Sequence, residues 1–148
     1  MSKNLVDICV NLTDEVFSGN EDSIIDEANQ KNITKMVLVG NDLKSSKKCQ
    51  ILAQKYNFFS TAGYHPHNAK EWDENSYTEL QKLIKFENVR AVGECGLDFN
   101  RNFSSPEIQH KVFAKHIDLA KETGLPLFVH ERDAFHQMHR ILSENVKD

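Results

Sequence analysis

Short apolar segments alternate with longer amphipathic segments along the chain, and this alternation predicts strands followed by helices. The apolar segments predict five strands, at Leu5–Val10, Thr34–Gly40, Phe58–Gly63, Asn88–Gly93 and Leu125–Val129. The segments between and after them predict helices at Glu21–Lys31, Leu43–Tyr56, Ser76–Lys85, 104–124 and Ala134–Leu142. Strands that are apolar on nearly every residue and separated by helices indicate a parallel sheet covered on both faces.

The helix after the fourth strand has the clearest end signals. Ser104 and Glu107 have the spacing of a capping box, and Pro106 suits the first turn. Gly124 fits the C-terminal stop, with Pro126 just beyond it. The apolar stripe of this helix is expected at Ile108, Val112, Phe113, Ile117 and Ala120.

Five strand–helix units leave the overall topology open between two arrangements. The 148 residues suffice for one domain with a hydrophobic core, and we expect residues 1–148 to form a single domain without a flexible linker. A closed barrel of eight such units typically needs ~250 residues. The sheet is therefore either an open, doubly wound one or the front part of a barrel. An incomplete barrel would expose two strand edges and part of its apolar layer.

Charge and cysteine usage narrow the setting in which the protein works. The formal net charge is −4, so a nucleic acid must be held by a local patch or a metal rather than by a general basic field. Cys9, Cys49 and Cys95 show no paired spacing, which favours small buried thiols in a reducing, cytoplasmic compartment. The N-terminus leads directly into a predicted strand, and no long apolar run follows, which argues against secretion and membrane spanning.

Two candidate functional residues stand at the ends of consecutive predicted strands. Glu94 ends the fourth strand and His130 ends the fifth. Their separation, 130 − 94 = 36 residues, suits one strand–helix–strand unit of ~30 or more residues. Parallel strands joined by helices bring their carboxyl ends to one edge of the sheet, so both side chains are expected in a common site. Alternatively, Glu94 caps a turn or pairs with Arg132, and His130 is a buried histidine with structural partners.

Further polar residues follow the third and fourth strands. His65 and His67 stand two residues apart, so in an extended backbone their side chains point the same way and can ligate a metal or contact a phosphate oxygen. The alternative is a surface loop with two solvated histidines. Asp98 either orients a metal ligand from behind or caps the turn at Asn100 and Arg101.

Several charged residues have weaker claims to function. Arg132 and Arg101 can each bind a phosphate in a bidentate manner, or form surface ion pairs with Asp133 and Asp98. A solvated helix face is the simpler interpretation for two other groups, namely His136 with His139 and the lysines Lys44, Lys47 and Lys48.

The strand-end residues, taken together, indicate a hydrolytic metal centre. His65, His67, Glu94 and His130 all fall at carboxyl ends of strands in consecutive units. Carboxylate and imidazole ligands suit a divalent ion that activates water and polarises a phosphoryl or acyl oxygen.

Four segments of the chain closely resemble the TatD-type metal-dependent deoxyribonucleases. The segments are Asp7–Thr13, Thr61–His67, Val92–Phe99 and Val129–Asp133. They occur in the family's order along the whole chain, and the Gly-Glu-Cys-Gly-Leu-Asp run within the third is highly specific. Asn11-Leu12-Thr13 and Asn100–Phe103 resemble the TatD branch of the family.

This resemblance implies an α/β fold of the TIM-barrel type of the metal-dependent hydrolase superfamily, present here as about five of eight units. It implies Mg²⁺-dependent hydrolysis of phosphodiester bonds, with Mn²⁺ or Zn²⁺ as other candidate ions. The expected activity is removal of nucleotides from the 3′ end of DNA, with single strands preferred and RNA as a further substrate.

The resemblance also assigns roles to particular residues. It makes Glu94 and His130 metal ligands, with Glu94 also catalytic, and makes His65 a catalytic histidine that contacts the scissile phosphate. We add His67 and Arg132 as phosphate contacts and Asp98 as a residue that orients a ligand.

The chain departs from the family pattern in two respects. Many members carry His-x-His on the first strand, where this chain has Cys9 and Asn11. The family's later histidine ligand and its late aspartate, which is expected to activate the water, have no counterpart before Asp148.

Three hypotheses follow. The first is a metal-dependent nuclease, and the second is a catalytically impaired fragment of one, stable with a partner or by pairing of its exposed strand edges. The third is a small flavodoxin-like binding module, although the first strand lacks a phosphate-binding loop.

Overall fold

The structure, a computed structural model, describes residues 4–145 and contains one parallel sheet of five strands in the order β1-β2-β3-β4-β5. The strands are β1 (Leu5–Val10), β2 (Ile33–Leu38), β3 (Phe59–Ala62), β4 (Val89–Asp98) and β5 (Leu127–Arg132). The α-helices are α1 (Glu21–Gln30), α2 (Leu43–Tyr56), α3 (Ser76–Ile84), α4 (Pro106–Thr123) and α5 (Phe135–Asn145). Two short 3-10 helices, η1 (Glu15–Phe17) and η2 (Pro66–Glu71), follow β1 and β3.

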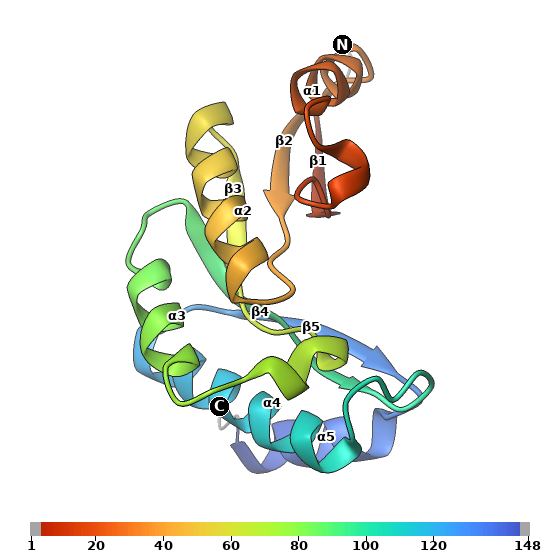
Figure 1. The fold of residues 1–148 in the computed structure, drawn as a ribbon, viewed down its shortest axis with the longest axis vertical. Helices are drawn as coiled ribbons and strands as arrows, with labels where there is room; N and C mark the ends of the chain where they lie inside the picture. Colours follow the sequence, from red (N-terminus) through yellow and green to blue (C-terminus); the bar gives the residue numbers. More distant parts are fainter. Residues whose placement is uncertain (1–3, 146–148) are drawn as a thin grey trace.

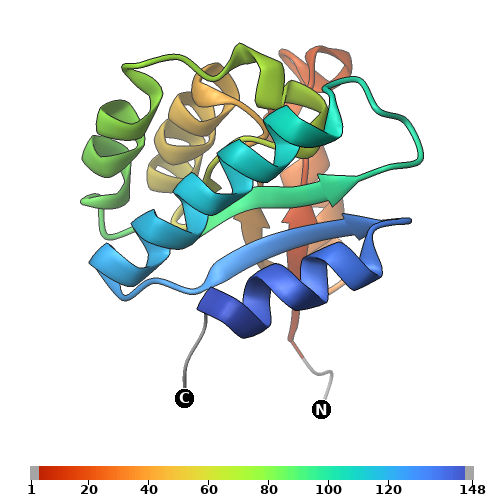
Figure 2. The ribbon, with the colours of Figure 1, turned by 90° about the horizontal axis from the view of Figure 1, so that it is seen from below.

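The sheet is strongly curled and its strands follow one another in sequence order. In Figure 1, β1 and β2 run down the view whereas β4 and β5 run across it, and helices lie along the outer side of this curve. Figure 1 and Figure 2 show α4 and α5 along the same, outer side of the β4–β5 pair. A flavodoxin-like sheet has the strand order 2-1-3-4-5. The sequential order therefore rules out the flavodoxin-like alternative and gives the partial (β/α) barrel predicted from the sequence.

The structure confirms the predicted strands and helices with small differences at their ends, and the largest difference is in β4. This strand was expected to end at Glu94 but continues to Asp98. Its pairing with β5 skips one residue, because Gly93 lies opposite Phe128 and Cys95 lies opposite Val129. Glu94 is the extra residue of this bulge. A bulge redirects a side chain without ending the strand, which the sequence pattern alone does not reveal.

The start of α4 differs from the predicted capping box. The N-cap is Ser105, whose side chain accepts a hydrogen bond from the backbone N–H of Ile108. Ser104 is buried instead, where its hydroxyl donates to the carbonyl of His67 and accepts from the N–H of Lys70. The end is as predicted, since Gly124 adopts a left-handed conformation at φ 70°.

The core lies between the helices and the outer face of the sheet, except at β1. Leu5, Val6 and Ile8 are 54%, 57% and 59% exposed. Leu5 and Val6 are neighbours and point to opposite faces, so both faces of β1 are exposed. This exposure is what we expected from an incomplete barrel. Cys9 is also exposed, which corrects its prediction as a buried thiol, whereas Cys49 and Cys95 are buried. Within residues 4–145, no helix is both long and apolar enough to cross a membrane.

Candidate metal centre

Three side chains from consecutive β/α units meet at the carboxyl edge of the sheet. His65 follows β3, Glu94 lies in the bulge of β4 and His130 lies in β5. One ligand atom from each lies within 4.8 Å of the other two. Glu94 Oε1 is 3.2 Å from His130 Nδ1 and 3.8 Å from His65 Nε2. The three side chains are 13%, 14% and 23% exposed for His65, Glu94 and His130, so the group is enclosed but open to a small ion.

Close packing of β3 against β4 holds Glu94 in this position. A Cβ added to Gly63 would lie 2.4 Å from the Cα of Gly93, so only glycine allows this approach. Gly93 itself has φ 134°, a backbone conformation that favours glycine. The N–H of Glu94 donates to the carbonyl of Gly40, two residues after the end of β2. The main chain at Gly93 and Glu94 is thus held both by its contact with Gly63 and by its hydrogen bond to Gly40.

Asp98 lies behind the group and uses both of its carboxylate oxygens. Its Oδ2 is 2.7 Å from His67 Nε2 and 3.2 Å from His130 Nε2. Its Oδ1 accepts hydrogen bonds from the backbone N–H groups of Asn100 and Arg101. Asp98 therefore contacts His130 and caps the turn at Asn100 and Arg101 at the same time. These are the contacts of the two interpretations that the sequence left open.

Several hydrogen bonds keep Asp98 ionised although it is fully buried. Burial by itself raises the pKa of this carboxyl. The hydrogen bonds from Arg101 N–H, His67 and His130 outweigh burial and lower the pKa well below its usual range.

His130 has a carboxylate at each ring nitrogen. Nδ1 faces Glu94 and Nε2 faces Asp98. The hydrogen bond to Glu94 is the main cause of a raised pKa for this imidazole. A histidine that ligates a metal through one nitrogen commonly donates its other N–H to a carboxylate, and Asp98 provides that partner here. The carboxylate–imidazole donor set of Glu94 and His130 fits a divalent ion.

His65 has a different hydrogen-bonding arrangement from His130. The sequence suggested an extended backbone through His67, but His65 caps η2 and its Nδ1 accepts the N–H of His67. In the neutral ring the proton therefore sits on Nε2, the nitrogen facing Glu94. Burial lowers the pKa of His65 to about 4. At neutral pH, His65 is consequently an uncharged donor at this site.

The remaining candidates lie around this group or away from it. His67 contacts the rings of both His65 and Phe103, the latter an exposed residue of the loop after β4. Arg132 is exposed and follows His130 by two residues in β5. Within residues 4–145 the side chains of Arg132 and Arg101 make no ion pair, so the surface pairs considered from the sequence are absent.

The polar residues of α5, and those in and just after β1, are not part of the group. His136 and His139 are exposed on α5 and pack against Phe135. Cys9 is near enough to Glu94 that the carboxylate, after burial, contributes to a raised pKa of the thiol. Asn11 accepts a hydrogen bond from the side chain of Asn41.

Two buried residues of α4 support the site and were not predicted. Gln109 accepts the N–H of Asp98 and donates to the carbonyls of Asp98 and Ser104. His116 Nε2 accepts the N–H of Tyr64, the residue before His65, while Nδ1 donates to the carbonyl of Val112.

The signal that could have revealed these residues was their spacing, because Gln109 precedes Val112 by three residues and His116 follows it by four, which places both on the same helical stripe. The inward face begins at Gln109 rather than at Ile108, which is exposed, and it includes His116. Polar residues on a buried stripe require hydrogen-bond partners, and here those partners are in the segments that carry the candidate site.

A curled sheet of parallel β/α units with a carboxylate and two imidazoles at its carboxyl edge defines the class of (β/α)-barrel proteins with a metal centre at that edge. Within this class the family is clear, because the family model for TatD related DNase matches residues 6–148. The chain belongs to this family.

Curated relatives and solved structures agree with this family. The chain is 44% identical over 132 residues to the 3′-5′ ssDNA/RNA exonuclease TatD of Edwardsiella piscicida, covering 88% of this chain and 51% of the relative. It is 38% identical over 141 residues to the protein of the same name from Dickeya dadantii, covering 94% of this chain and 53% of that protein.

Two solved structures share the fold. The crystal structure of YJJV, a TatD homolog from Escherichia coli, superposes with a TM-score of 0.88 at 25% identity, over 95% of this chain and 56% of that one. The crystal structure of a hydrolase of the TatD family from Entamoeba histolytica superposes with a TM-score of 0.88 at 27% identity. The match covers 97% of this chain and 55% of that one. The chain thus spans about half the length of the relatives it matches.

Proposed function

We propose that the protein is a divalent-metal-dependent nuclease that removes nucleotides from the 3′ end of single-stranded DNA, with RNA as a further substrate. The observation that carries this proposal is the meeting of Glu94 with His65 and His130 at the carboxyl edge of the sheet. Membership of the TatD related DNase family and the names of the curated relatives support it.

In this proposal Glu94 and His130 hold the ion, and Asp98 orients His130 through its Nε2. Mg²⁺ is the first candidate, and Mn²⁺ or Zn²⁺ also suits a donor set that contains imidazole. When bound, such an ion polarises a phosphoryl oxygen and makes a nearby water a stronger acid.

His65 and Arg132 act on the substrate rather than on the ion. The neutral ring of His65 offers its Nε2–H to a non-bridging oxygen of the scissile phosphate, where negative charge builds up. Arg132 provides a planar, permanently charged group for the same phosphate or the next one. His67 is a further phosphate contact, held by its bond to Asp98.

The proposal also covers the extent of the domain and the cellular compartment. We propose residues 1–148 as one domain, of which residues 1–3 and 146–148 lie outside the described structure. A reducing cytoplasm suits the three free thiols, of which two are buried.

A second candidate is a catalytically impaired form that requires a further polypeptide to complete its site. Two observations favour it. The chain spans about half the length of its curated relatives, and the apolar residues of β1 are more than half exposed.

The test is release of nucleotides from 5′-labelled single-stranded DNA with Mg²⁺ or Mn²⁺ present and after chelation. The parent should shorten the strand from its 3′ end only with the ion, and Glu94→Gln should lose at least about 100-fold in rate. Glu87→Gln is the matched control. It removes the same charge, but at an exposed residue that precedes β4.

Equal rates for the parent and Glu94→Gln would overturn the proposed site. A folded parent without activity above buffer would overturn the nuclease proposal for this chain and favour the second candidate.

A further inference from the structure

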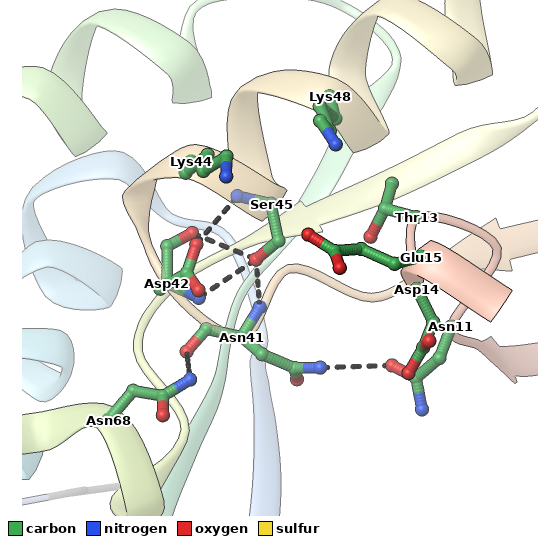
Figure 3. A pocket seen from close by; sticks show the side chains of 10 residues that line it. All are labelled: Asn11, Thr13, Asp14, Glu15, Asn41, Asp42, Lys44, Ser45, Lys48 and Asn68. Atoms are coloured by element: carbon green, nitrogen blue, oxygen red, sulfur yellow. Dashed lines mark hydrogen bonds between the residues drawn. The ribbon is translucent and has the colours of Figure 1, made fainter. Parts of the chain in front are cut away.

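A polar cavity of about 480 Å³ lies at the same edge of the sheet as the candidate metal centre. Three asparagines line it, each from a different β/α unit (Figure 3). Asn11 follows β1, Asn41 follows β2, and Asn68 lies in η2 after β3. The cavity is within the ~300–1,000 Å³ of small-molecule sites, which is enough for one nucleotide.

The cavity and the metal centre share a wall. The carbonyl of Asn41 accepts both the backbone N–H of His65 and the side-chain amide of Asn68. His65 is a member of the metal group, and Asn68 is three residues further along. A ligand in the cavity is therefore next to any phosphate held at His65.

Two lysines of α2 place positive charge at one side of the cavity. Lys44 and Lys48 stand one helical turn apart and both line the cavity. Neither lysine has an ion pair among residues 4–145. Three acidic residues also line the cavity, but Asp14 and Asp42 cap η1 and α2 through side-chain hydrogen bonds. All three carboxylates keep their charge, so the attraction for an anion is confined to the side of the cavity where Lys44 and Lys48 lie together on α2.

The amides in the cavity wall offer complementary hydrogen-bonding groups. Asn41 Nδ2 donates to Asn11 Oδ1 at 3.0 Å, which leaves the amide N–H groups of Asn11 for a ligand. The Oδ1 of Asn41 is buried and has no hydrogen-bond partner among the described residues. A buried acceptor without a donor is unfavourable, and a ligand N–H would satisfy it. Adjacent amide donors and acceptors match the edge of a nucleobase.

We propose that this cavity holds one unpaired nucleotide of the substrate strand, next to the scissile phosphate. Its phosphate lies against Lys44 and Lys48, and its base edge lies against the amides of Asn11 and Asn41. A base in a duplex has this edge occupied by its partner, so the cavity selects single strands. This inference rests on the proposed function, because it specifies the substrate of the same site.

The test measures binding without catalysis. The ¹H–¹⁵N NMR spectrum of the parent is titrated with thymidine 5′-monophosphate, thymidine and inorganic phosphate in the presence of EDTA. We expect thymidine 5′-monophosphate to bind more tightly than either of the others and to shift the signals of Asn11, Asn41 and Asn68.

Paired variants identify the contribution of the two lysines. Lys44→Gln/Lys48→Gln should weaken binding of the monophosphate by about tenfold or more and leave thymidine binding unchanged. Lys47→Gln is the matched control on the same helix, because Lys47 is paired with Glu79 and does not line the cavity. It should bind like the parent.

A parent that does not bind the monophosphate, or a double variant that binds it like Lys47→Gln, would overturn the inference. Equal affinity for inorganic phosphate and the monophosphate would overturn its base-binding part. Because EDTA removes the ion and no bond is cleaved, these outcomes are independent of whether the hydrolysis assay succeeds.

Discussion

At the scale of single residues, the surroundings of each histidine determine its protonation and therefore its role. His130 has carboxylates at both nitrogens, which keeps its orientation fixed and its basicity high. The Nδ1 of His65 accepts a hydrogen bond from a backbone N–H, so the neutral ring carries its proton on Nε2 and donates from there. The two rings are 4.3 Å apart between centroids, yet they offer different chemistry to the same space.

His116 makes a prediction about stability and pH. Burial lowers its pKa to about 4 from an ordinary value of 6.5. The folded protein keeps this ring neutral while the unfolded chain protonates it, so the free energy of unfolding falls as pH drops from about 6.5 toward 4. Acidification from pH 7 to pH 5 should therefore lower the free energy of unfolding by about 2 kcal/mol through this group.

The measurement is urea unfolding of the parent and His116→Gln at both pH values. The amide of glutamine offers an acceptor and a donor like the imidazole it replaces but does not titrate. The variant should therefore lose about 2 kcal/mol less than the parent on acidification. An identical loss in both proteins would show that His116 is not the group responsible.

At the scale of elements, glycine positions allow the strands to bring the site together. Gly63→Ala places a methyl group against the backbone of Gly93, where no flexible side chain can move aside. We expect a loss of about 2–3 kcal/mol in the free energy of unfolding, as for other overpacked positions.

Gly19→Ala provides the comparison for Gly63→Ala. Gly19 also has a positive φ, but a Cβ there meets nothing within 4 Å. It should cost about 1–2 kcal/mol, from backbone conformation alone. Unfolding measured by circular dichroism gives both values, and a Gly63→Ala protein as stable as the parent would contradict the close approach of β3 and β4.

The elements themselves were predictable from sequence, whereas their local geometry was not. Runs of apolar residues and amphipathic periodicity depend on neighbours in the chain, so the bounds of β1 and α2 agree with the prediction. The bulge at Glu94 depends on pairing with β5, and the partners of Gln109 and His116 depend on how α4 packs. These are contacts between distant segments, and one sequence carries no direct signal for them.

At the scale of the whole molecule, the curled sheet leaves β1 as an edge strand with apolar side chains in water. Leu5, Val6 and Ile8 are each more than half exposed. Exposed apolar edge strands pair with other chains unless charge prevents it. We therefore expect this chain to associate with a second copy through β1.

Sedimentation velocity over a range of concentrations tests this association. The parent should show a monomer–dimer equilibrium, and Val6→Lys should shift it toward monomer because a charge on an edge strand opposes pairing. Lys substituted for the exposed Ile51 of α2 is the control and should leave the equilibrium unchanged. A parent that remains monomeric at every concentration would contradict the prediction.

The central claim is that Glu94 and His130 hold a divalent ion beside His65. The most direct measurement is titration of the protein with Mn²⁺, followed by the electron paramagnetic resonance signal of the free ion. The account predicts saturable binding of Mn²⁺ by the parent and by Glu87→Gln. Glu94→Gln removes a ligand itself, so its affinity for Mn²⁺ should fall by more than the ~10–100-fold that is typical when a residue that only orients a ligand is lost. Binding of Mn²⁺ by Glu94→Gln with the affinity of the parent would contradict the account.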